Sequence, residues 1–185
     1  MRITRAVLLL IWITFVTASM SIAGDPDTTT FVWVRHPGNP VFPATPGTWR
    51  DVQAANPDLL VIGDTCFMYF RGQRGGHDRI GVARIPRDRF DGFTWNIHPQ
   101  PIIDVGGPGS WDENHALDPA AVLHNGTVYL YYTASSPRED RSVCLATSQD
   151  GLHFRKFDGN PVIIGGGPEV VVKDRPACAA IGPLS

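Results

Sequence analysis

Two stretches of the chain, Trp49–Arg71 (WRDVQAANPDLLVIGDTCFMYFR) and Trp111–Thr133 (WDENHALDPAAVLHNGTVYLYYT), align without a gap at a constant offset of 62 residues. Each begins with a tryptophan that is followed two positions later by an acidic residue, and each continues through a proline, an apolar run, a turn and an aromatic run. Tyr69 aligns with Tyr131 in the aromatic run. Self-similarity at a fixed period of this length indicates a protein built from repeated supersecondary units.

Each copy is predicted to start with a β-hairpin. In the first copy the residues from Pro57 to Ile62 form a short apolar run, Gly63-Asp64 a turn, and Thr65 to Phe70 a β-branched and aromatic run. The second copy turns on Asn125-Gly126, a strong hairpin signal. The elements that complete the units are a third strand in each copy and a Pro-apolar strand start: Arg79–Ile85, Ser142–Thr147, Pro101–Ile103 and Pro161–Ile163.

Four short strands per unit, with no helical pattern between them, predict an all-β fold, a β-propeller of four-stranded blades. A β-sandwich also uses short strands and regular turns, but it does not require this self-similarity. Propellers close with about four to eight blades, and the chain holds about two and a half, since a third copy starts at Pro168–Asp174. We therefore expect residues 24–185 to be a partial propeller domain of a truncated chain; assembly from several chains is the alternative.

Residues 1–23 are predicted to be a signal peptide. Met1–Arg5 carries two arginines, Ala6–Val16 is apolar and uncharged, and small residues precede a cleavage point after Ala23. A membrane anchor is the alternative, but this apolar run is shorter than the roughly 20 residues that a membrane span needs. The sequence therefore predicts a secreted or periplasmic protein that is not bound to a membrane after cleavage.

Composition argues against several other classes of protein. The formal net charge is −2 and no basic block is present, whereas nucleic-acid binding requires a clustered positive surface. The three cysteines, Cys66, Cys144 and Cys178, lack the spacing of a metal site and allow at most one disulfide. We expect no nucleic-acid partner, no metal and no cofactor.

Candidate functional residues lie where the predicted innermost strand of each blade begins. The polar residue before the first proline of each copy would point toward the propeller axis, and this position holds Asn56, Asp118 and Gly167. Aromatic and acidic side chains in the entrance loops suit a sugar, whose ring faces stack on tryptophan while its hydroxyls bind carboxylates. The residues predicted to bind substrate are Asn56, Trp49, Trp111, His115 and Arg71.

This pattern resembles the five-bladed glycoside hydrolases of the arabinanase, levansucrase and invertase superfamily, over about Val34 to Asp174. The resemblance implies a secreted glycoside hydrolase-like protein with three carboxylates on successive blades: a base or nucleophile, a residue that tunes its neighbours' pKa, and an acid. Asp118 matches the tuning residue. Asn56 stands in place of the base and Gly166 in place of the acid.

The catalytic candidates are therefore Asp118 and the other carboxylates expected near the mouth: Asp51, Asp58, Glu113 and Glu169. Retention or inversion of configuration depends on the carboxylate separation, which the sequence does not give. Two alternatives remain open, a propeller that binds carbohydrate without cleaving it and a purely structural propeller. Structural roles are also open for individual residues: inter-blade packing for the tryptophans, ion pairing or capping for Asp51 and Glu113, and backbone contacts for Asp118.

Overall fold

The computed structural model describes residues 32–164. The predicted signal peptide, Glu169, Cys178 and the third copy of the repeat lie outside these residues. The chain divides into two units, Met1–His36 and Pro37–Ser185, and the secondary structure described here belongs to the second. Within the described part, no helix is both long and apolar enough to cross a membrane.

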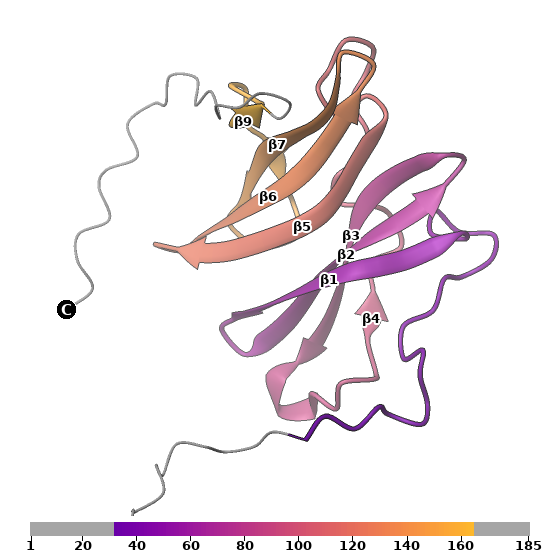
Figure 1. Ribbon diagram of the computed structural model, residues 1–185. Helices are drawn as coiled ribbons and strands as arrows, with labels where there is room; N and C mark the ends of the chain where they lie inside the picture. The colour runs from indigo at the N-terminus through magenta and orange to yellow at the C-terminus, as the bar shows by residue number, and fades with distance from the viewer. Residues whose placement is uncertain (1–31, 165–185) are drawn as a thin grey trace, which may run out of the picture. The chain divides into compact units, whose positions relative to one another are not determined.

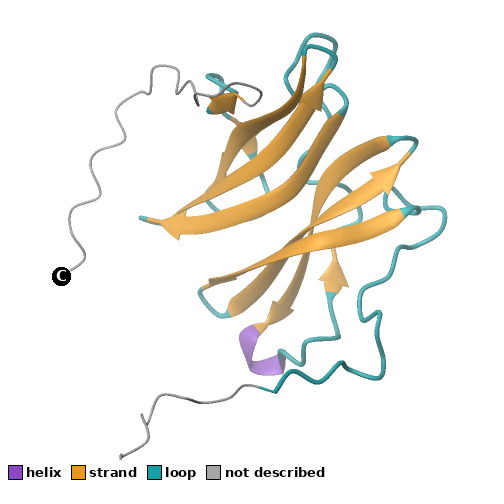
Figure 2. Cartoon of the chain, viewed as in Figure 1, coloured by secondary structure: helices purple, strands orange, loops and turns teal. Residues whose placement is uncertain are grey.

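The described chain forms two antiparallel β-sheets (Figures 1 and 2). The first sheet contains, in order, β1 (Gln53–Ile62), β2 (Thr65–Arg74), β3 (His77–Pro86) and β4 (Asn96–Ile97), with a short 3-10 helix η1 (Arg87–Arg89) between β3 and β4. The second sheet contains β5 (His115–His124), β6 (Thr127–Ser136), β7 (Glu139–Ser148) and β8 (Arg155–Lys156), and β9 (Ile163–Ile164) pairs with β7. The prediction of an all-β fold is confirmed.

The repeat seen in the sequence is also a repeat of strands. β5 and β6 begin 62 residues after β1 and β2. Both hairpins turn through residues with positive φ, Gly63 in the first sheet and Asn125-Gly126 in the second, and this backbone twist matches that of the flanking strands. A register irregularity between Ala134 and Ser136 offsets the β6–β7 pairing by one residue.

The main core lies between the two sheets. One face of the first sheet, with Phe67, Tyr69, Ile80 and Val82, packs against a face of the second sheet built from Val128, Leu130, Tyr132, Cys144 and Ala146. These two faces are not equivalent faces of the repeat. At the offset of 62 residues, Val128 aligns with Cys66, which precedes Phe67 and therefore points to the other side of its sheet. The sheets therefore stack front to back, as consecutive blades of a propeller do.

The two remaining faces differ in how they are covered. On the first sheet, Phe70 and its neighbours Met68 and Ala83 are covered by Phe42, Trp49, Trp95 and Ile97. On the second sheet, the face that points away from the first sheet is open. Tyr131 on this face is 39% exposed, whereas Tyr69, which holds the same repeat position in the first sheet and lies in the core between the sheets, is 0% exposed.

Both cysteines in the described part are buried free thiols, Cys66 and Cys144. Burial raises the pKa of the Cys144 thiol to about 12. The thiol is therefore protonated at neutral pH and behaves as a small apolar side chain of the core.

Candidate functional site

Asn56 and Asp118 occupy equivalent β-bulges near the start of β1 and β5. The register of each hairpin shifts there, between Ala55 and Asp58 and between Leu117 and Ala120. Both residues adopt left-handed backbone conformations, with φ of 50° and 51°. Asn and Asp are the non-glycine residues that tolerate this region best, and such bulges often redirect side chains near functional sites.

The two bulges bring their side chains together across the junction of the sheets. β5 contacts β1, and the strands lie next to each other in Figure 1. The amide Nδ2 of Asn56 donates a hydrogen bond to Oδ1 of Asp118. The sequence prediction that these two positions share one site agrees with this contact, although their function is not tested by it.

A buried charge cluster lies beside this pair. Asp78 at the start of β3 accepts two hydrogen bonds from Arg71, 2.7 Å from Nε to Oδ1 and 3.1 Å from Nη2 to Oδ2. Nδ1 of His115 lies 2.9 Å from Oδ2 of the same carboxylate, whose side chain is 4% exposed. Since a buried carboxylate is stable only when its charge is compensated, the guanidinium of Arg71 holds Asp78 in place, and the Asp78 carboxylate in turn orients the ring of His115.

His115 therefore links the two sheets. Its Nδ1 also lies 3.3 Å from the backbone N–H of Asp78, and Nδ1 of His77 lies 2.8 Å from the carbonyl oxygen of Asn114. When Nδ1 of His115 carries a proton, it donates to the Asp78 carboxylate, and Nε2 on the other side of the ring is left to accept or donate according to the charge of the ring. His115 is thus a positioned polar group at the junction.

Asp118 also borders a hollow of about 310 Å³ on the open face of the second sheet, together with Thr133, Arg141, Ser142, Val143 and Ile163. By the pairing registers, Thr133 corresponds to Arg71 and Arg141 to Asp78. In the first sheet, the side chain of His115 from the second sheet lies against this position and contacts Asp78. Hydroxyl, guanidinium and carboxylate groups around a half-open hollow of this size suit a small polar ligand.

Three of the other predicted carboxylates are engaged in structural contacts. Oδ2 of Asp58 accepts a 2.6 Å hydrogen bond from the backbone N–H of Ala121 and so ties the two sheets together. Glu113 accepts a hydrogen bond from the backbone N–H of Gly109 at 2.7 Å. Asp51 lies 3.6 Å from Nε of Arg74. Their predicted catalytic roles remain untested, and Glu169 lies outside the described residues.

The two predicted tryptophans make packing contacts. Trp49 stacks on Phe70 with ring centroids 5.6 Å apart, and a Cβ atom added at Gly81 would lie 2.3 Å from the indole, so the ring needs glycine beneath it. Trp111 packs against the core between the sheets, and the guanidinium of Arg138 lies 5.2 Å from its ring. Packing thus accounts for much of each ring's surface, and contact with a sugar remains a prediction.

Asp78 and His77 belong to the cluster but were not among the residues predicted from the sequence. They follow the Gly75-Gly76 turn that joins β2 to β3, and a turn of this kind places the first residues of β3 beside the last residues of β2. The pairing of Gln73 with Asp78 shows that this end of the hairpin coincides with the end where β1 begins. The sequence feature that could have identified them is the pair of polar residues, His77 and Asp78, directly after this turn.

No protein-family model matches the sequence. Solved structures do match. A family 117 glycoside hydrolase from the marine bacterium Zobellia galactanivorans is 26% identical and superposes with a TM-score of 0.58, over 67% of this chain and 37% of that one. A putative glycoside hydrolase from Bacteroides ovatus is 21% identical, with a TM-score of 0.57 over 66% of this chain and 39% of that one. The chain has the fold of propeller glycoside hydrolases.

A third match comes from the GH130 family, described as mannoside phosphorylases that also include glycoside hydrolases targeting β-1,2 mannosidic linkages in Candida mannan. It is 18% identical, with a TM-score of 0.57 over 66% of this chain and 40% of that one. The resemblance predicted from the sequence is confirmed at the level of the fold, and the first and second sheets are two propeller blades. The chain spans 37% to 40% of the length of these three structures.

Proposed function

We propose that this chain is a carbohydrate-active propeller protein that acts on a poly- or oligosaccharide, and that Asn56 and Asp118 belong to its sugar site. The observation that carries the proposal is the pairing of these two side chains, which come from equivalent bulges on neighbouring blades. The similarity of the fold to several glycoside hydrolases supports it.

Asp118 is suited to orienting a substrate. Its Oδ1 accepts the hydrogen bond from the Asn56 amide, which fixes the rotation of the carboxylate, and the residue borders the hollow on the second blade. A carboxylate held in this way can accept a hydrogen bond from a sugar hydroxyl through its other oxygen, and its negative charge raises the pKa of a neighbouring acid. These are the properties of the tuning residue expected from the sequence.

Hydrolysis of a glycoside requires two further functions, a protonated group at the leaving oxygen and an ionised group on the opposite side of the sugar. The contacts of Asp58 and Glu113 favour structural roles for these two residues. Asp51 makes only a 3.6 Å ion pair with the exposed Arg74. We therefore propose that at least one of the two functions comes from outside residues 32–164, with Glu169 as a candidate. His115, oriented by Asp78, is placed to contribute a substrate contact.

Substitution of Asp118 by Asn keeps the shape of the side chain and removes its charge. We expect the release of reducing sugar from a responsive polysaccharide to fall by about a hundredfold, because the contact that orients the substrate and the charge that raises a neighbouring acid's pKa are lost together. Asp158→Asn is a matched control, because Asp158 is an exposed carboxylate paired with Arg155. Equal rates for Asp118→Asn and the unmodified chain would show that the site lies elsewhere.

A second candidate function is carbohydrate binding without cleavage. It is favoured by Asn56, because an amide stands where the resemblance implies a catalytic base, and an amide cannot accept a proton at neutral pH. Binding measured by calorimetry together with no release of reducing sugar would establish this function and exclude hydrolysis. Here too Asp118→Asn should weaken binding while Asp158→Asn should not.

We also propose that the protein is exported and processed after Ala23. Expression of the full chain in a secreting host should yield a protein outside the cytoplasm whose first residue is Gly24, as determined by N-terminal sequencing. Replacing Ala23 by Arg should block this cleavage, because signal peptidase requires small residues there. Recovery of the unmodified chain with Met1 intact would contradict the prediction.

A further inference from the structure

A second polar surface lies at the end of the first blade opposite to the Asn56–Asp118 pair. It borders a hollow of about 430 Å³ that is lined by Arg84, Arg89, Asp91, Thr94 and Asn96, among others. Thr65 pairs with Pro86 at this end of the sheet, whereas Gln73 pairs with Asp78 at the other end. The hollow is therefore separate from the proposed sugar site.

Three arginines of this surface carry no internal partner. Within residues 37–164, the side chains of Arg84, Arg87 and Arg89 form no hydrogen bond, ion pair or ring contact, while the other cationic side chains there are engaged. Arg79 with Asp104, Arg155 with Asp158, and Arg138 over Trp111 are examples. Guanidinium groups that the protein itself does not neutralise are available to an anionic ligand.

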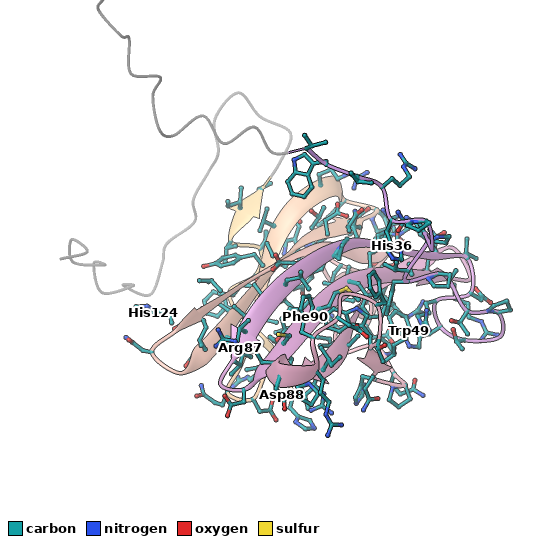
Figure 3. All side chains as sticks on the ribbon, turned by 90° about the horizontal axis from the view of Figure 1, so that it is seen from below. His36, Trp49, Arg87, Asp88, Phe90 and His124 are labelled. Carbon is teal, nitrogen blue, oxygen red and sulfur yellow. The ribbon has the colours of Figure 1, made fainter. Side chains whose placement is uncertain are left out.

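Exposed aromatic rings lie next to these arginines. Phe90 and Phe93 are each 47% exposed, and Phe90 packs edge-on against Trp95 with ring centroids 5.7 Å apart. Figure 3 shows Arg87, Asp88 and Phe90 near one another, on and beside η1. Aromatic surface beside polar groups is the usual lining of sites that bind sugar rings.

The carboxylate of Asp91 is occupied within its own turn. It accepts hydrogen bonds from the backbone N–H groups of Phe93 and Thr94 and from the Thr94 hydroxyl. These bonds, led by those from Thr94, lower the pKa of Asp91 to about 2, so the group stays ionised at neutral pH. Its role is to fix the loop that carries Phe93, and none of its contacts is an ion pair with the arginines.

We propose that this surface binds an anionic polysaccharide, one that carries carboxylate or sulfate groups. The guanidinium groups of Arg84, Arg87 and Arg89 would form paired hydrogen bonds with these anionic groups, and Phe90 would lie against the apolar face of a sugar ring. Asp88 and Asp91 lie within the surface, so its positive charge is moderate. This favours a sugar chain over the denser charge of a nucleic-acid backbone, which requires a more continuous basic track.

The test measures binding of the full chain to dextran sulfate and to polygalacturonate, with neutral dextran as the comparison. The triple variant Arg84→Gln/Arg87→Gln/Arg89→Gln should bind the two anionic polymers roughly ten- to thirtyfold more weakly, on the basis of exposed ion-pair strengths. The control Arg74→Gln/Arg138→Gln/Arg155→Gln removes the same charge from arginines that have partners, and it should lose no more than about threefold. Binding by the unmodified chain should weaken as salt is added.

The variant Phe90→Ala should bind several-fold more weakly than the unmodified chain, and an unchanged melting temperature would show that each variant is folded. The proposal is overturned if the triple variant binds like the unmodified chain, if neither polymer binds, or if neutral dextran binds equally well. Binding to single-stranded oligothymidylate but not to the polysaccharides would identify a nucleic-acid surface instead. Release of reducing sugar, measured in parallel, should be unchanged in the triple variant, so failure here leaves the proposed sugar site untouched.

Discussion

Replacing Tyr69 by Ala should destabilise the chain by about 3–5 kcal/mol, as large-to-small substitutions of fully buried aromatic residues do. Tyr69 is 0% exposed, its ring contacts Phe154 of the second blade edge-on at 5.8 Å, and its hydroxyl donates a 3.1 Å hydrogen bond to the carbonyl oxygen of Gly151. Burial raises the pKa of the Tyr69 hydroxyl, which therefore stays protonated as a donor. The substitution would open a cavity between the blades.

Tyr131 provides a control within the same chain. It holds the repeat position of Tyr69, but no blade covers it among the described residues, and it is 39% exposed. We expect Tyr131→Ala to cost about 1 kcal/mol, the usual cost of a partly exposed residue. Urea denaturation of both variants measures the difference, and equal losses would contradict the stacking of the two blades described above.

If Tyr69→Ala does not fold, Tyr69→Phe tests the same junction with a smaller loss of stability. It removes the hydrogen bond to Gly151 and keeps the ring, so the expected loss is about 1 kcal/mol. In the unmodified chain this close contact requires glycine at position 151, because a Cβ atom there would lie 2.8 Å from Cδ1 of Ile62 and 2.9 Å from the Tyr69 hydroxyl.

The three long strands of each sheet could be predicted from the sequence because the repeat carries local signals. The short strands β4 and β8 were not predicted, and Pro101–Ile103, predicted as a strand start, forms only an isolated bridge between Ile103 and Ile80. Gly63 and Asn125-Gly126 fix the hairpin turns, and the alternation of aromatic residues around Tyr69 and Tyr131 marks one face of each strand. The same offset that aligned the two copies places Asn56 and Asp118 in equivalent bulges. Local turn chemistry and periodicity are properties of neighbouring residues, so one sequence is sufficient to detect them.

The contacts across the junction could not be predicted in this way. Asp58 was expected among the catalytic carboxylates, but its oxygen binds the backbone of Ala121, 63 residues away. Asp112, in the loop that enters the second blade, is buried and binds Nζ of Lys156 at 2.6 Å and the Tyr132 hydroxyl at 2.9 Å. Whether a carboxylate faces solvent, a cation or a backbone amide depends on how one blade stacks on the next, and strand periodicity does not specify this.

The second large effect is expected from the buried carboxylate at the junction. Asp78→Asn removes the carboxylate charge that compensates Arg71, and breaking a buried ion pair costs about 3–5 kcal/mol. Arg71 is 20% exposed, so partial hydration of its guanidinium should reduce the loss to about 2–4 kcal/mol. Chemical denaturation of the variant measures it.

Asp104→Asn is the matched control, since Asp104 also pairs with an arginine, Arg79 at 2.6 Å, but its side chain is 59% exposed. Exposed pairs contribute about 0–1 kcal/mol, so this variant should be nearly as stable as the unmodified chain. The double variant Arg71→Met/Asp78→Asn should recover part of the stability lost in Asp78→Asn, because it no longer buries an uncompensated charge. A double variant less stable than Asp78→Asn would show that Arg71 stabilises the junction through packing, with its charge of little consequence.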